Sequence, residues 1–254
     1  MPHRKAGGTG ETVRTVAAAV FVALLVRTVA FEPFNIPSGS MIPNLLVGDY
    51  LFVSKYSYGY SRFSMPLSPP FFSGRMLFSE PKRGDIAVFK YPRDVSVDYI
   101  KRIIGLPGDR IQVRGGRLYI NGTMMMRERV EDYVYIDTEG HIMRSARYIE
   151  TLPNGTHYPI LEAGDAARYD DTPEYVVPEG HYFMMGDNRD RSADSRTVDV
   201  GFVPSENLVG RAEILFFSTN GTARFWEFWK WPVATRWGRL FRDLRASSSG
   251  DDVS

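Results

Sequence analysis

The sequence predicts an all-β fold preceded by one N-terminal transmembrane helix. Two observations favour strands in the body of the chain. Short runs of apolar and β-branched residues recur between turn residues from residue 32 onward. Asn-Gly, the preferred two-residue hairpin turn, occurs at Asn121, Asn154 and Asn220. No long amphipathic helix stands out among these segments, so an all-β architecture is expected.

The overall composition excludes several classes of function. The 254 residues include 31 Lys and Arg against 30 Asp and Glu, a formal net charge of +1. That balance provides no basic excess for a nucleic-acid partner. The chain has no cysteine, which excludes disulfides, thiolate catalysis and cysteine-ligated metals. Its four histidines show no metal-ligand spacing, and we expect neither a cofactor nor a metal site.

The first element is an apolar segment at residues 13–31, where 15 of 19 residues are apolar. A helix of this length spans roughly 28 Å, close to the roughly 30 Å of a bilayer core. Arg14 and Arg27 lie near its two ends, from which long basic side chains can reach the headgroups. The uninterrupted stretch at 16–26 is only 11 residues, so a cleaved signal peptide is an alternative.

Flanking charges predict the orientation of this anchor. Basic residues precede the apolar segment, and after Arg27 the next lysine is Lys55. The positive-inside rule then predicts a cytoplasmic tail at residues 1–12 and export of the rest of the chain.

The strands expected after the anchor share apolar or aromatic residues and flanking turn signals. They are residues 50–56, 86–91, 98–104, 111–113, 118–120, 182–185 and 209–217. Residues 123–180 are richer in charge and turn signals, which is typical of an inserted lobe. The stretch at 224–244 alternates Trp or Phe with Arg or Lys, a composition that suits a membrane headgroup layer. A surface helix docked on the domain is the alternative for that stretch.

Two segments contain candidate nucleophile and base residues. Ser38-Gly39-Ser40 lies between two prolines, and a serine there could be a nucleophile, although such a tripeptide is usually a plain loop. In the expected strand at 98–104, Lys101 shares a face with Tyr99 and Ile103. Burial between apolar neighbours would lower the pKa of the lysine, and a neutral amine can act as a general base. The alternative is an edge-strand lysine that reaches solvent.

Two further segments carry less specific signals. Residues 82–89 indicate a turn that leads into an apolar strand. Residues 185–196 contain several acids and arginines, but a calcium loop is rejected. Ser192 occupies its sixth position instead of Gly, and Val198 its twelfth instead of Glu. A network of salt bridges fits better. A Ser–Lys dyad is one option from these residues, and a histidine-based triad stays formally possible.

These four segments, in this order, resemble the motif boxes of the bacterial type I signal peptidase (leader peptidase) family, over residues 31–109 and 181–217. The resemblance implies that Ser40 is the acyl nucleophile and Lys101 the general base. It also implies that Ser38 stabilises the oxyanion beside the Ser40 backbone N–H, and that Ser192 orients the Lys101 amine. The implied supporting residues are Gly186, which allows close backbone approach, Asp194 and Arg196 as an ion pair, and Asp187 and Arg189 as scaffold.

The resemblance further implies the substrates, which are the signal peptides of exported preproteins with Ala-X-Ala before the cleavage site. Two shallow apolar pockets would accept the small side chains, and the substrate would add as an extended strand. The implied pocket residues are Phe34, Ile36, Met41, Leu45, Val88, Tyr99 and Ile100. No metal and no nucleic acid are implied.

The implied organisation is a single-pass protein of the bacterial inner membrane, with lipid and the export translocon as partners. A tail at 1–12 and an anchor at 13–31 precede a catalytic β core at 32–109 and 181–217. That core is interrupted by a β lobe at 110–180 and followed by a Trp/Arg-rich membrane-proximal tail at 218–254. The catalytic domain would lie on the outer, periplasmic side.

Some positions depart from the family pattern. Arg191 stands where many members carry Asn, and residues 197–201 are slightly longer and less aromatic than usual. Two alternatives remain at this point. One is a specialised Ser/Lys peptidase of a secretion or conjugation system, and the other is a non-catalytic membrane-tethered β module.

Overall fold

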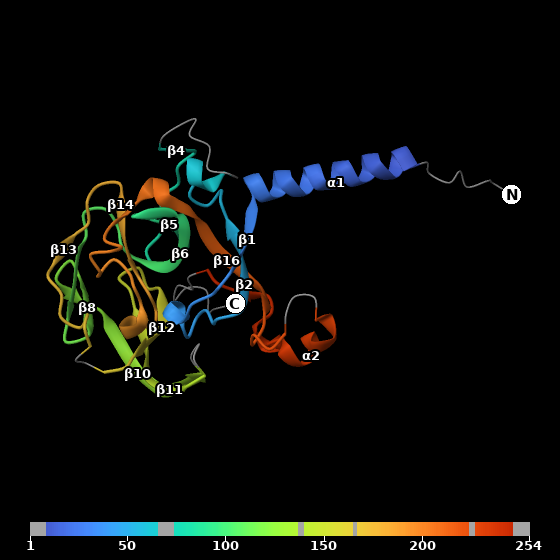
Figure 1. Cartoon of the computed structure of the whole chain (residues 1–254). Coiled ribbons are helices and arrows are strands. Elements are labelled where there is room, and N and C mark those ends of the chain that lie inside the picture. The colour runs from blue at the N-terminus through green and yellow to red at the C-terminus, as the bar shows by residue number, and fades with distance from the viewer. Residues whose placement is uncertain (1–8, 66–73, 137–139, 165–166, 224–226, 246–254) are drawn as a thin grey trace.

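The computed structural model describes residues 9–65, 74–136, 140–164, 167–223 and 227–245. Its first element is helix α1 (Thr9–Val29), which projects away from the body of the molecule (Figure 1). Within the described residues, no helix combines the length and apolar character needed to cross a membrane. The transmembrane anchor therefore stays a prediction. Phe31, expected as the end of the anchor, instead opens strand β1 and pairs with Ser54, because strand pairing overrides local propensity.

The body is mostly β, as expected. Its largest sheet has the strand order β1-β2-β16-β5-β6-β14-β15, with β17 pairing at the side of β16. Every pairing in this sheet is antiparallel. The strands are β1 (Phe31–Asn35), β2 (Asp49–Ser54), β5 (Ile86–Tyr91), β6 (Asp94–Gly105), β14 (His181–Met185), β15 (Val203–Pro204), β16 (Leu208–Ser218) and β17 (Arg242–Asp243).

Two smaller sheets are formed between residues 110 and 180. One has the order β13-β7-β8-β9 and the other the order β10-β11-β12. Their strands are β7 (Arg110–Arg114), β8 (Arg117–Ile120), β9 (Thr123–Met124), β10 (Met126–Ile136), β11 (Ile142–Thr151), β12 (His157–Glu162) and β13 (Tyr175–Val176). A two-stranded sheet of β3 (Tyr60–Ser61) and β4 (Arg75–Met76) completes the set.

One of the three Asn-Gly pairs makes the expected two-residue hairpin turn. Asn121 and Gly122 both have positive φ, 53° and 80°, and they join β8 to β9 in a two-residue turn. Asn154 and Gly155 lie in the loop between β11 and β12. The third pair is not a hairpin turn. Asn220 follows β16, and its N–H donates to the carbonyl of Ala234 in the C-terminal tail.

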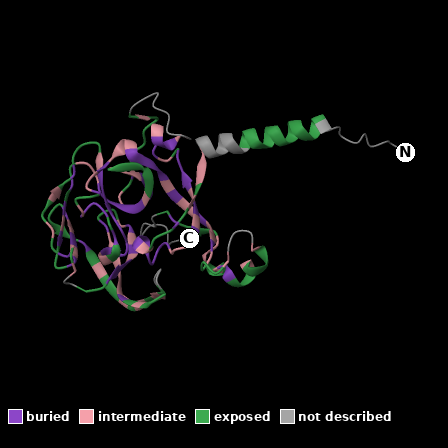
Figure 2. Ribbon diagram, in the orientation of Figure 1, coloured by how far each residue is buried: buried purple, intermediate pink, exposed green. Residues whose placement is uncertain are grey.

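Strand β6 connects the separate parts of the core. Its first half, from Asp94 to Asp98, is exposed, whereas its second half is buried on both faces. Ile103 packs with Phe89 in one hydrophobic cluster, and Ile104 packs with Phe183 in another. Figure 2 shows the buried residues inside the body and the exposed residues 10–22 of α1. The core therefore fixes the end of β6 that follows the candidate base.

Short helical turns complete the fold. They are η1 (Gly39–Met41), η2 (Arg62–Ser64), η3 (Arg189–Arg191), η4 (Ser205–Asn207), η5 (Phe228–Lys230), α2 (Trp231–Ala234) and η6 (Trp237–Arg239). The segment with α2 lies on the same side of the molecule as α1 (Figure 1). Trp229, Trp237 and Phe241 are exposed there. Trp226, part of the predicted aromatic tail, lies outside the described residues.

Candidate active site

Ser40 lies in the η1 turn, which the hydrophobic core holds from one side. Its neighbour Met41 is fully buried, and so is Leu45 one turn further along. From the other side, the Asn188 backbone N–H donates to the Ser40 carbonyl at 3.0 Å, and the Asn188 side chain donates to the Gly39 carbonyl at 3.1 Å. The backbone of the Ser40 turn is therefore held from two sides. The Ser40 hydroxyl is the group of this turn that can react.

Lys101 and Ser40 are in direct contact. Nζ of Lys101 donates to Ser40 Oγ at 2.6 Å and to the Ile100 carbonyl at 3.0 Å. The lysine is only 4% exposed. This burial lowers the pKa of Lys101 to about 8, against the opposing pull of the Asp194 and Asp187 carboxylates. A substantial fraction of the amine is therefore neutral near pH 8, in contact with a serine hydroxyl.

The strand alternation expected at 98–104 is present. Lys101 reaches Ser40, whereas the next residue, Arg102, reaches Asp187. Tyr99 lies on the Lys101 side, with Nζ 5.4 Å from the ring centroid. The sequence pattern therefore correctly predicted that Lys101 and Arg102 point to opposite faces of the strand.

Ser38 lies at the mouth of the same site. Its hydroxyl is 3.4 Å from Ser40 Oγ, and the residue is exposed and lines the cleft in front of the serine. If Ser40 Oγ attacks a carbonyl carbon, the rotatable Ser38 hydroxyl can donate a hydrogen bond to the oxygen of that carbonyl group.

The loop at 186–196 packs tightly behind the Ser40 turn. A Cβ added to Gly186 would lie 2.6 Å from the Ser40 carbonyl oxygen and 2.3 Å from Ser192 Oγ. The Gly186 N–H donates to Asp194 Oδ2 at 3.0 Å. Asp194 also pairs with Arg196 through two contacts of 2.9 Å. The close approach at Gly186 and the Asp194–Arg196 ion pair are both present in the structure.

Ser192 does not make the contact that was expected of it. The residue is 4% exposed, and its Oγ has no hydrogen-bond partner among the described residues. No hydrogen bond joins it to Lys101, whose Nζ donates to Ser40 and Ile100. Ser192 is nevertheless within the site, because it lies against Gly186.

Asp187 and Arg189 pair with residues that the sequence did not reveal. Asp187 accepts from Arg102 Nε at 2.8 Å and Nη2 at 2.7 Å, and Arg189 pairs with Glu150. Tyr158 donates to Glu150 at 2.7 Å. All five side chains are buried. The Arg102 guanidinium carbon lies 4.0 Å from the centre of the Tyr158 ring, which joins the two pairs into one network of charges beside the candidate dyad. Sequence spacing cannot show such pairs because the partners lie far apart along the chain.

A cleft of about 850 Å³ opens in front of Ser40 and Lys101. Of the predicted pocket residues, Tyr99 and Ile100 line it. The other five belong instead to the core cluster that also contains Ile100, with Phe34 packed against its margin. Other side chains also line the cleft. They belong to the end of β10, the 186–196 loop and the C-terminal tail. They include Tyr135, Ile136, Asn188, Arg191, Asn220 and Arg236.

Asn188 and Arg102 are the functional residues that sequence reasoning missed. Both lie inside the recognised segments, at 185–196 and 98–109. Asn188 anchors the nucleophile turn, and Arg102 neutralises Asp187. Arg102 could have been found from strand alternation, since its side chain faces away from Lys101 and toward the core, where a buried cation needs a carboxylate partner.

Comparison with known proteins relates the chain to one family. A family model described as "Signal peptidase, peptidase S26" matches residues 9–217. Signal peptidase I of Rickettsia canadensis (strain McKiel) is 43% identical over 255 residues, covering 93% of this chain and 94% of that protein. Signal peptidase I of Rickettsia conorii is 44% identical over 247 residues, covering 90% of each protein. A crystal structure of a signal peptidase I from Enterococcus faecalis V583 shares 31% identity, covers 52% of this chain and 97% of that one, and has a TM-score of 0.31.

Proposed function

Since the chain belongs to the signal peptidase family, peptidase S26, we propose that it removes N-terminal signal peptides from exported preproteins with Ser40 as nucleophile and Lys101 as general base. The 2.6 Å contact between Lys101 Nζ and Ser40 Oγ is the observation that carries this proposal. A serine hydroxyl needs a base within hydrogen-bond reach, and a lysine serves only when its amine is neutral. Burial provides that condition, because it lowers the pKa of Lys101 to about 8.

In the acylation step, Ser40 Oγ attacks the carbonyl carbon of the scissile peptide bond while Lys101 Nζ accepts the hydroxyl proton. The carbonyl oxygen becomes an oxyanion, and the Ser40 backbone N–H and the Ser38 hydroxyl donate hydrogen bonds to it. When the tetrahedral intermediate collapses, the C–N bond breaks and Lys101 returns the proton to the leaving amine. The signal peptide is then held as an ester on Ser40.

In the deacylation step, water attacks the ester carbon and gives a proton to the neutral Lys101. The second tetrahedral intermediate expels Ser40 Oγ, which takes the proton back from the lysine. The site returns to its starting state, with a free carboxylate on the signal peptide.

An open edge of strand β6 suits an extended substrate. On its β14 side, β6 pairs only through Arg102, Ile103 and Gly105. Residues 97–101 have no strand partner on that side within the described part of the chain, and they line the cleft. A substrate strand can hydrogen-bond to this edge and lead its scissile bond toward Ser40. The small side chains of an Ala-X-Ala site fit a cleft whose nearest apolar wall includes Tyr99 and Ile100.

The supporting loop positions the reacting groups in this proposal. Asn188 holds the Ser40 turn, and the Asp194–Arg196 pair fixes the Gly186 N–H behind it. In this proposal, Ser192, which lies against Gly186 behind the Ser40 turn, receives a hydrogen bond from the Lys101 amine when Ser40 is acylated and no longer takes that bond. We assign Ser192 this positioning role.

The proposed location is the bacterial inner membrane, with the N-terminus cytoplasmic and the catalytic domain outside. The apolar segment at 13–31 supports an anchor, and α1 projects on the same side as the exposed aromatic residues around α2 (Figure 1). Phe228, Trp229, Trp237 and Phe241 are between 62% and 72% exposed, a frequent arrangement for residues that enter a headgroup layer. Lipid would then contact this side, and the export translocon would supply the emerging signal peptides.

Mass spectrometry of a cleaved preprotein tests the function. A preprotein with an Ala-X-Ala site is incubated in detergent with the wild type, with Ser40→Ala, and with Ser79→Ala as a matched control. Ser79 is exposed and lies outside the cleft. We expect cleavage after the second alanine by the wild type and the control only. Cleavage by Ser40→Ala would refute the nucleophile, and no cleavage by the wild type over a panel of preproteins would refute the general peptidase.

A further inference from the structure

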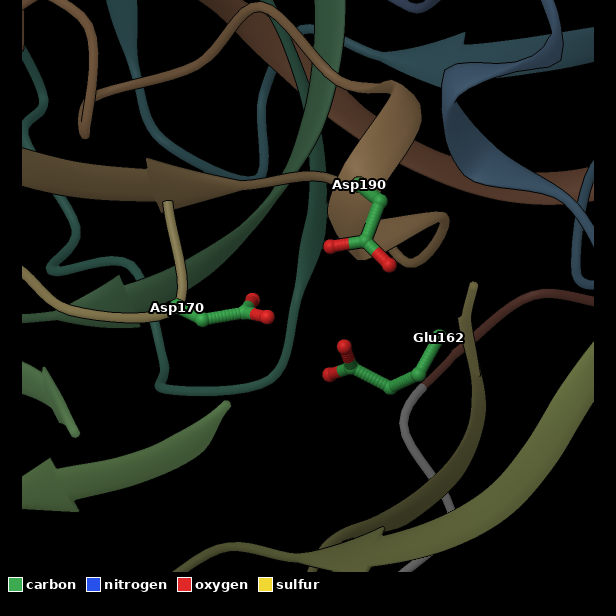
Figure 3. Close-up of side chains that lie close together, drawn as sticks. All are labelled: Glu162, Asp170 and Asp190. Carbon is green, nitrogen blue, oxygen red and sulfur yellow. The ribbon is translucent and has the colours of Figure 1, made fainter. Parts of the chain in front are cut away.

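Three acidic side chains meet at a place where the reaction proposed above has no use for them. Glu162 ends strand β12, Asp170 lies in the loop before β13, and Asp190 belongs to the η3 turn. Figure 3 shows their carboxylates pointing toward one another across a common space. One oxygen of each lies within 4.8 Å of the other two. The three residues come from distant segments, so no local sequence motif connects them.

Two of the carboxylate oxygens in this cluster have no hydrogen-bond partner among the described residues. Glu162 and Asp170 are each only 2% exposed. Glu162 Oε2 and Asp190 Oδ1 are buried, and neither accepts a hydrogen bond from any described residue. The other Glu162 oxygen lies 3.5 Å from Arg127, which is an ion-pair distance. Leaving a buried carboxylate oxygen without a donor is unfavourable, so the arrangement indicates that a positively charged group belongs there.

The charge of the cluster fits a divalent cation. Three carboxylates and the neighbouring Arg127 sum to −2, while Arg189 is engaged in its own pair with Glu150. A positive charge at the centre would relieve the repulsion among the three acids.

We propose that Glu162, Asp170 and Asp190 together bind one Ca²⁺ ion. Carboxylate oxygens are hard ligands, and Ca²⁺ takes about 6–8 of them at roughly 2.3–2.6 Å. Oxygens on opposite sides of a Ca²⁺ ion therefore lie up to about 5 Å apart, which accommodates the 4.8 Å limit of this cluster. Mg²⁺ binds at about 2.0–2.1 Å and would require the three chains to close around it.

The site differs from the continuous calcium loop that the sequence excluded at 187–198, because only Asp190 is common to both. Through Asp190, a bound ion would contact the loop at 186–196. The Leu161 N–H donates to the Asp187 carbonyl at 2.9 Å, so the end of β12 already contacts the loop that carries Asn188. A bound ion would tie this loop to β12 and to the segment before β13. We infer a structural role that is independent of the proposed peptidase reaction.

Thermal unfolding of the full chain in detergent tests this proposal. The protein is freed of metal with EDTA, dialysed, and then titrated with Ca²⁺ or with Mg²⁺. We expect Ca²⁺ at a hundredfold excess over its Kd to raise the Tm by roughly 5–10 °C. Glu162→Gln should lose most of this rise, and so should Asp190→Asn. Glu179→Gln is the matched control, since Glu179 is exposed and outside the cluster, and it should keep the full rise.

The metal-free state gives a second, opposite readout. Without Ca²⁺, Glu162→Gln should be at least as stable as the wild type, because it removes one of three repelling charges. With Ca²⁺ the order should reverse. If a variant fails to fold, a binding assay on the wild type replaces the comparison. Bound Tb³⁺ is excited through the tyrosines, and its luminescence should fall when Ca²⁺ displaces it. No Ca²⁺ effect on the wild type, an equal effect on Glu162→Gln, or a rise with Mg²⁺ alone would each overturn the proposal.

Discussion

At the scale of single residues, the pKa of Lys101 predicts how activity depends on pH. The neutral amine is the active form, so kcat/KM should rise as pH increases through about 8 and should fall about tenfold for each pH unit below it. The rise is expected in this direction because burial lowers the lysine pKa from 10.5. Stopped assays with an uncharged Ala-X-Ala peptide between pH 5.5 and 10 measure the profile. A flat profile would contradict a lysine base.

A control for this profile keeps the positive charge but removes the base. Lys101→Arg retains a cation in the same place, and a guanidinium does not deprotonate in this pH range. We expect no activity at any pH in the series. Activity of more than about 1% of the wild type would mean that another group accepts the Ser40 proton.

Gly186 makes the second prediction at this scale. Gly186→Ala should reduce kcat at least about tenfold and destabilise the fold by about 1–3 kcal/mol, because the new Cβ would overlap the Ser40 carbonyl and Ser192. Gly238→Ala is the matched control, since no atom lies within 4 Å of its added Cβ. Peptide kinetics and urea unfolding measure the two effects. Equal kinetics for both variants would mean that the Ser40 turn tolerates displacement.

At the scale of elements, a buried ion pair joins strand β6 to the loop after β14. Asp187→Asn would leave the Arg102 guanidinium buried without its counter-charge, and we expect a loss of about 3–5 kcal/mol in the free energy of unfolding. Asp243→Asn breaks an exposed pair with Arg245 and should change stability by less than about 1 kcal/mol. Urea titrations of both variants measure this contrast.

The same pair can be removed as a unit. Replacing Arg102 by Met and Asp187 by Leu together should recover much of the loss, because no lone charge remains in the core. A double variant that is no more stable than Asp187→Asn would show that the geometry of the network, and not its charge balance, sets the stability.

Sequence reasoning succeeded for elements whose signal is local. Residues 86–91 were predicted as a strand and form β5 with those bounds, and the Asn121-Gly122 turn was predicted from two residues. Strand β6 begins at Asp94, four residues before its predicted start. Its exposed first arm does alternate Val95 and Val97 with polar residues, a short strand signal that the prediction did not use. By contrast, which side chains from distant segments meet depends on how the strands pair, and local sequence does not show this. Glu150 and the Glu162, Asp170 and Asp190 cluster therefore had no signal in the sequence.

At the scale of the whole molecule, the side that carries α1 and α2 should bind lipid. In flotation with vesicles of anionic phospholipid, the full chain should rise with the membrane, and a chain without residues 1–29 should float less. Trp229→Ser with Phe241→Ser should weaken binding of that shortened chain further. Val176→Ser is the matched control, because Val176 is 58% exposed on β13, at the other side of the body (Figure 1). Equal flotation of all variants would refute this orientation.

The unpaired stretch of β6 beside Ser40 also limits how much of a preprotein the enzyme can inspect. Hydrogen bonds from a strand edge contact peptide groups, which every residue has, so this edge distinguishes an extended chain from a helical one but hardly one side chain from another. Discrimination is left to the few side chains that point into the cleft. A single catalyst of this design can therefore serve a large and diverse set of clients whose sequences agree at only two small residues.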